Sequence, residues 1–123
     1  MMEKYLEIPY KAGGRSKSGC DCWGFVRLII KEEKGMELPS YDGLDETKTD
    51  GLETSYQKLP GPQDWAIVLM QQRRTHAHVG LYLKGSILHM THSGACFVPA
   101  SRLRQYEVKG YYSVQGKACR EHI

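Results

Sequence analysis

Residues 19–24 read GCDCWG, and the apolar run FVRLII follows them at once. From Cys22 onward, apolar side chains recur at the spacing of one face of an α-helix. Asp21 is a typical N-cap residue, and Gly35 is typical of the position just past a helix end. The pattern therefore predicts a helix over about 22–34, with Asp21 as its cap and Cys22 in its first turn.

Cys20 and Cys22 flank this cap, and the pair allows three interpretations. A disulfide framework would need oxidising surroundings, but the N-terminal residues lack the apolar stretch of a secretory signal peptide. We therefore expect reduced thiols in a chain made in the cytoplasm, for Cys96 and Cys119 as well. A zinc site could join Cys20 and Cys22 to His76 and His78, although neither pair has the usual spacing of structural zinc ligands.

The third interpretation is a nucleophile. The exposed amides at the start of a helix favour a thiolate, and they can later bind an oxyanion. A thiolate nucleophile needs a partner base, usually histidine. A cysteine in a first helical turn is also often a small core residue, so the pattern by itself leaves both possibilities open.

After Pro62 the sequence changes to short runs rich in β-branched and aromatic residues, separated by turn signals. The runs are WAIVLM, HVGLYL, SILHM, ACFVP and YEVKGYYSV. They predict a meander of about five antiparallel strands, and one helix followed by such strands is an α+β pattern. With 123 residues, we expect a single domain over 1–123.

The remaining segments predict loops. Residues 10–20 are rich in glycine and serine, while 40–63 is polar and acidic, with a short helix expected near 52–59 and a possible role as a lid. No apolar run approaches the roughly 20 residues of a membrane span. The net charge of +3 is too small to indicate nucleic-acid binding.

Two histidines fall on neighbouring predicted strands. If 78–83 and 86–91 form a hairpin, His89 lies diagonal to His78 on the same face, close enough for the two rings to meet. A second histidine could then fix the tautomer of the first. We expect His92 and His122 to be structural or surface residues.

These motifs, in this order, resemble the NlpC family of papain-like cysteine peptidases, which cleave peptidoglycan stem peptides. The matching segments are PYKAGGRSKSGCDCWGFVRLI, PGPQDWAIVLM and HVGLYLKGSILH, within about residues 5–112. The resemblance implies a papain-like α+β fold, in which an N-terminal catalytic helix packs on the antiparallel sheet.

The resemblance also implies roles for individual residues. Cys22 would be the nucleophile, His78 the general base and acid, and His89 the residue that orients His78. The backbone N–H of Cys22 and the hydroxyl of Tyr10 would bind the oxyanion. Cys20 would be a passive thiol, and no metal or other cofactor would be needed.

One departure narrows the resemblance. This chain has D-C-W-G where many wall-remodelling members have D-C-S-G, and Leu-Pro-Ser-Tyr follows the predicted helix. Those features resemble members that phages and prophages encode as tail components. We therefore expect a tail-associated hydrolase that acts at the bacterial wall, with stem peptides and other tail-tip proteins as partners. The expected scissile bond joins D-glutamate to the diamino acid.

Three alternatives remain open at this point. The same triad could serve an amidase or acyltransferase with a different substrate, because specificity lies in loops. The chain could be a structural tail-tip protein with a vestigial site. It could also be the zinc-binding module that uses Cys20, Cys22, His76 and His78.

Overall fold

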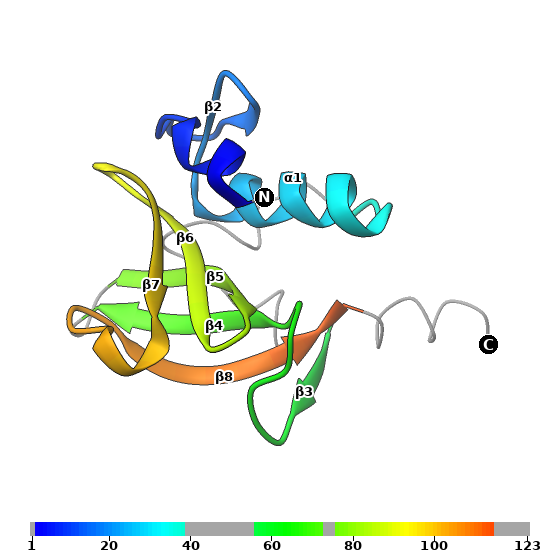
Figure 1. Cartoon of the computed structure of the whole chain (residues 1–123), viewed down its shortest axis with the longest axis vertical. Helices are drawn as coiled ribbons and strands as arrows, with labels where there is room; N and C mark the ends of the chain where they lie inside the picture. Colours follow the sequence, from blue (N-terminus) through cyan, green and yellow to red (C-terminus); the bar gives the residue numbers. More distant parts are fainter. Residues whose placement is uncertain (1, 39–55, 73–75, 115–123) are drawn as a thin grey trace.

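The computed structural model describes residues 2–38, 56–72 and 76–114 (Figure 1). Its elements are the 3-10 helix η1 (Met2–Glu7), the strands β1 (Arg15–Ser16) and β2 (Gly19–Cys20), the helix α1 (Cys22–Lys34), the strands β3 (Gln57–Leu59), β4 (Ile67–Gln72), β5 (His76–Leu83), β6 (Ser86–Thr91) and β7 (Gly94–Pro99), the 3-10 helix η2 (Ala100–Arg102) and the strand β8 (Glu107–Ser113).

The predicted helix is confirmed with its cap. The extended backbone of Asp21 precedes α1, and the Asp21 carboxylate accepts a hydrogen bond from the Gly24 N–H at 2.7 Å. Gly35 ends the helix in the left-handed region at φ 71°, where a side chain would be strained, and its N–H donates to the Lys31 carbonyl. The helix therefore presents Cys22 as the first residue of its first turn.

The larger sheet has the strand order β3-β8-β4-β5-β6-β7, with every pairing antiparallel. β4 to β7 form the predicted meander, but the prediction is wrong for the last strand. β8 does not add beside β7; it returns to pair with β4, on the opposite side of β4 from β5. Local strand signals do not specify a partner across the sheet, so the pairing of β8 with β4 after the short connection 100–106 was not visible in the sequence.

Two loop predictions also need correction. The segment 10–20 contains the small β1–β2 hairpin, which is joined to the preceding chain by hydrogen bonds from the Cys20 N–H to the Pro9 carbonyl and from the Lys11 N–H to the Cys20 carbonyl. The helix expected near 52–59 is wrong at Gln57–Leu59, which pair with β8 as an edge strand. The rest of that expected helix, and the proposed lid, fall largely on residues 39–55, outside the described ranges.

The main core lies between α1 and the sheet, and α1 packs against β5 and β6 (Figure 1). Alternating residues of β4 divide between two clusters: Ile67 and Leu69 join the main core, whereas Val68 and Met70 join a smaller cluster on the opposite face. No helix in the described part of the chain is long and apolar enough to cross a bilayer. The helix and sheet together confirm the α+β class.

The close approach of α1 to the β1–β2 hairpin gives a stability prediction. A Cβ added at Gly24 would overlap the carbonyl oxygen of Gly14, which is backbone and cannot rotate away. Alanine gains about 1 kcal/mol over glycine in helix propensity. Overpacking against backbone should outweigh that gain, so we expect Gly24→Ala to lower the free energy of unfolding by about 2 kcal/mol.

Urea unfolding followed by circular dichroism measures this effect. Gly61→Ala is the matched control, because an added Cβ there meets no atom within 4 Å, and we expect it to change stability by less than about 0.5 kcal/mol. Equal effects of the two substitutions would contradict the close contact.

Candidate active site

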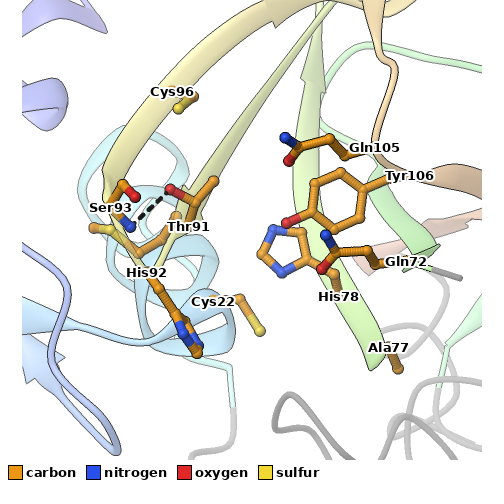
Figure 2. A pocket seen from close by; sticks show the side chains of 11 residues that line it. Cys22, Gln72, Ala77, His78, Thr91, His92, Ser93, Cys96, Gln105 and Tyr106 are labelled. Atoms are coloured by element: carbon orange, nitrogen blue, oxygen red, sulfur yellow. Dashed lines mark hydrogen bonds between the residues drawn. The ribbon is translucent and has the colours of Figure 1, made fainter. Parts of the chain in front are cut away.

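A cavity of about 510 Å³ brings together residues from distant parts of the chain. Figure 2 shows the Cys22 thiol, from the start of α1, and the His78 ring, from β5, both pointing into it. Its other lining residues are Gln72, Ala77, Met90, Thr91, His92, Ser93, Cys96, Gln105 and Tyr106. Two of the three residues predicted for the triad thus line one cavity.

The third predicted member, His89, contacts His78 directly. The Nε2 atom of His78 lies 2.9 Å from Nδ1 of His89, and both side chains are buried. The strand register explains the contact, because His89 lies directly opposite Gly80 and hence diagonal to His78. A Cβ at Gly80 would lie 2.9 Å from Ile87 Cγ2 and 3.0 Å from the His89 Cβ, so the missing side chain makes room for the β6 residues opposite it.

The contact determines which nitrogen can exchange protons. Nε2 of His78 is engaged by His89, so Nδ1 is the ring atom left for Cys22. For Nδ1 to accept a proton, neutral His78 must carry its hydrogen on Nε2 and donate it to Nδ1 of His89. That bond persists when Nδ1 becomes protonated, so His89 can hold the ring in both states.

The surroundings of the pair keep both rings uncharged. Burial, with smaller contributions from His89 and His92, lowers the pKa of His78 from 6.5 to about 3. Burial likewise lowers the pKa of His89 to about 4. Near neutral pH both imidazoles of the free protein are therefore neutral, which is the form of His78 that can act as a base.

The cap of α1 is held by a partly buried ion pair. Arg15 Nη1 lies 2.6 Å from Asp21 Oδ1 and also donates to the Gly14 carbonyl. The buried Asp21 carboxylate is thus satisfied by the guanidinium and by the Gly24 N–H. The cap role predicted for Asp21 is confirmed, whereas Arg15 was missed because one basic residue in a glycine-rich loop carries no signal.

Cys20 does not share the surroundings of Cys22. Its Sγ donates to the Ser16 carbonyl, and burial, with a smaller contribution from the Asp21 charge, raises the thiol pKa to about 11. Cys20, Cys22 and Cys96 are all free thiols.

Cys20 is fully buried and is not among the residues that line the cavity of Cys22 and His78, with which the zinc hypothesis would join it. Among the described residues, no group of three or more His, Cys, Asp or Glu side chains could hold a metal ion. The side chain of His76, another proposed ligand, lies outside what the structure describes.

Tyr10 lies near the cavity without lining it. Its half-buried ring is 4.5 Å from the ring of His92, centroid to centroid, and His92 does line the cavity. The oxyanion role of Tyr10 stays a prediction. His92 is exposed, as expected for a surface residue, but its place on the cavity was missed.

Tyr106 was also missed, because nothing in the segment between β7 and β8 points to His78. Its ring stacks on that of His78.

Comparisons with known proteins agree with this geometry. The family model described as the NlpC/P60 family matches residues 7–114. Murein DD-endopeptidase MepS/Murein LD-carboxypeptidase from Escherichia coli K12 is 33% identical over 86 residues, which cover 68% of this chain and 43% of that protein. The protein of the same name from E. coli O157:H7 matches equally. The chain thus spans less than half the length of these curated relatives.

Among solved structures, the crystal structure of the NlpC/p60 domain of the peptidoglycan hydrolase SagA matches with a TM-score of 0.64. The match covers 91% of this chain and 92% of that one, at 17% identity. At that identity the match shows the fold, and the predicted papain-like architecture is confirmed.

The buried histidines predict acid sensitivity. Their folded-state pKa values lie below the unfolded value of 6.5, so as pH falls below 6.5 the unfolded chain binds protons that the folded chain excludes. Their contribution to stability is therefore complete above pH 6.5 and is lost on acidification. Each excluded proton costs about 1.4 kcal/mol per pH unit, so we expect the pair to account for a loss of about 3–5 kcal/mol between pH 6.5 and pH 4.5.

Urea unfolding at several pH values tests this in the wild type and in His89→Gln, whose carboxamide can still accept the His78 bond. The variant should lose about half of this acid-dependent destabilisation. Ser93→Ala is the control, because it removes an exposed side chain without an ionisable group from the same cavity and should leave the pH slope near that of the wild type. An unchanged slope in His89→Gln would contradict the prediction.

Proposed function

The chain belongs to the NlpC/P60 family, and we propose that it is a cysteine peptidase that hydrolyses amide bonds of peptidoglycan stem peptides. The observation that carries the proposal is the meeting of Cys22, at the start of α1, with the His78–His89 pair at one cavity. Only the family-level statement rests on the comparisons.

In the proposed reaction, the Cys22 sulfur attacks the carbonyl carbon of the scissile amide while its proton passes to Nδ1 of His78. The oxyanion of the tetrahedral intermediate is bound by the Cys22 N–H and the Tyr10 hydroxyl. His78 then gives its proton to the leaving amine as the C–N bond breaks. Water, deprotonated by His78, hydrolyses the thioester, releasing a carboxylate and restoring the thiol.

The cavity suits a peptide that bears carboxylates. Its described lining offers the carboxamides of Gln72 and Gln105 and the hydroxyl of Ser93, which can donate to and accept from backbone amides, whereas the Thr91 hydroxyl already donates to the Gly94 carbonyl. No Asp or Glu is among the lining residues, so a carboxylate near the scissile bond meets no like charge. Stem peptides carry such carboxylates.

The nucleophile is tested by substitution. We expect Cys22→Ala to abolish hydrolysis of purified muropeptides, and His78→Ala to lower kcat/KM by about 10³-fold or more, because proton transfer and thiolate formation are both lost. Mass spectrometry of the products measures the loss and also identifies the bond. Cys96→Ala is the matched control, since it removes another free thiol from the same cavity and should leave activity nearly unchanged.

Thiol reactivity gives a second measurement that needs no substrate. With limiting iodoacetamide at about pH 6, Cys22 should be labelled in preference to Cys20 and Cys96, because neutral His78 can accept the thiol proton as the sulfur is alkylated, and the preference should disappear in His78→Ala. Full hydrolysis by Cys22→Ala would overturn the peptidase proposal. Equal, slow labelling of all thiols would favour the alternative of a structural protein with a vestigial site.

We further propose that the scissile bond joins D-glutamate to the diamino acid. The support is the family resemblance. The name of the E. coli relatives gives two activities, DD-endopeptidase and LD-carboxypeptidase, so membership of the family does not determine the bond. Product masses that place cleavage elsewhere in the stem would correct the bond while leaving the mechanism intact.

A role as a phage tail component is the last part of the proposal, and it rests on the D-C-W-G and Leu-Pro-Ser-Tyr features. Trp23 is fully buried and packs edge-on against Tyr56 at 6.4 Å, so this tryptophan belongs to the core and not to the cavity. We therefore take the D-C-W-G motif as a mark of a subgroup of the family and not as a sign of a different reaction. Proteomic analysis of purified phage particles from the host tests it, and absence of the chain from those particles would contradict it.

A further inference from the structure

Tyr106 stands out because it contacts both histidines of the site. Its ring lies nearly parallel to that of His78, at 4.7 Å between centroids and 15° between planes. The same ring meets His89 edge-on, at 5.5 Å and 87°. Since His78 and His89 also contact each other, the three rings form a closed cluster in which each touches the other two.

A register shift places Tyr106 on the correct face of the sheet. Met70 pairs with His78 on one side and with Val108 on the other, so these side chains share a face, and Tyr106, two residues before Val108, shares it too. The bulge between Leu69 and Met70 makes this possible, because it inserts one residue of β8. Without that shift the side chain of Tyr106 would point to the opposite face.

Tyr106 packs against apolar side chains and also lines two hollows. It packs against the small cluster of Val68, Met70 and Ile87, so its ring has a fixed support. It also lines the catalytic cavity, and it lines a second hollow of about 470 Å³ on the side of Arg104 and Glu107. Tyr106 therefore contacts the histidine pair and at the same time borders both hollows.

We propose that Tyr106 is a positioning residue for His78: its ring holds the imidazole in the plane where Nε2 meets His89 and Nδ1 remains available to Cys22. This inference rests on the proposed function for its catalytic consequence, but its structural consequence can be measured without substrate. Tyr106 itself exchanges no proton and forms no bond in the reaction.

The physical need for such a residue is clear from the histidine side chain. The ring torsion of histidine is broad and roughly two-fold, and a single hydrogen bond at Nε2 leaves the ring free to swing about that bond. A parallel ring stacked on one face opposes this swing. It also excludes water from the His78–His89 bond, which strengthens that bond in the low local dielectric.

The test compares Tyr106→Phe, which keeps the stacked ring, with Tyr106→Leu, which removes it and keeps an apolar contact to the cluster. The first readout is the pH titration of the His78 imidazole by NMR. Burial is the main cause of the lowered pKa of this group, so we expect Tyr106→Leu to raise the titration midpoint by at least about one unit. Tyr106→Phe should titrate like the wild type.

The second readout is kcat on muropeptides. We expect Tyr106→Leu to lower kcat by about 10- to 100-fold, because the base is no longer aligned, and Tyr106→Phe to retain most of it. Tyr111→Leu is the matched control. Tyr111 packs against the same small cluster but pairs with Tyr82 at 5.8 Å, away from the histidines, so both readouts should stay near wild type.

The outcomes separate the two proposals. Wild-type titration and kcat in Tyr106→Leu would overturn the positioning role, and so would equal effects of Tyr106→Leu and Tyr111→Leu. A shifted titration in Tyr106→Leu, together with full activity of Cys22→Ala, would overturn the peptidase proposal and leave the positioning role standing. If Tyr106→Leu does not fold, Tyr106→Met, which is closer in length to the lost ring, takes its place under the same criteria.

Discussion

The hydrogen bond from the Gly24 N–H to the Asp21 carboxylate determines where α1 begins, and the rest of the site depends on that start. A helix turns by about 100° per residue, so a start displaced by one residue would carry Cys22 away from the cavity. The Gly14 carbonyl reinforces the start, because it accepts from both the Asp21 N–H and Arg15 Nη1. The glycine at 24 is what allows helix and hairpin to approach so closely.

The histidine pair depends on a different constraint, which is burial. Both rings are nearly inaccessible, and that environment disfavours the charged form of each. A neutral imidazole can accept a proton from a thiol, but a buried imidazole also loses the favourable solvation that an exposed one would have. His89 offsets part of this cost, because it gives the buried Nε2 of His78 a partner and leaves Nδ1 to the reacting side.

The parts of this structure that could be predicted from the sequence are those determined by residues close together along the chain. The helix, its cap and the diagonal meeting of His78 and His89 each follow from a short segment, since the cap spans residues 21–24 and the hairpin two adjacent strands. The pairing of β8 with β4 could not be predicted in this way, because strand propensity does not say which edge a strand will join. The stacking of Tyr106 on His78 was still less predictable from the sequence, since it requires both that pairing and a one-residue bulge within it.

The position of β8 also bears on the order in which the protein assembles. β4 is made early but obtains one of its two neighbours only when β8, far along the chain, has left the ribosome. Contacts between segments so distant in sequence form slowly, because the intervening chain must first be closed into a loop. Until then the nascent chain holds an incomplete sheet and lacks the tyrosine ring over its histidines. A partly synthesised chain therefore carries the thiol but not the finished site.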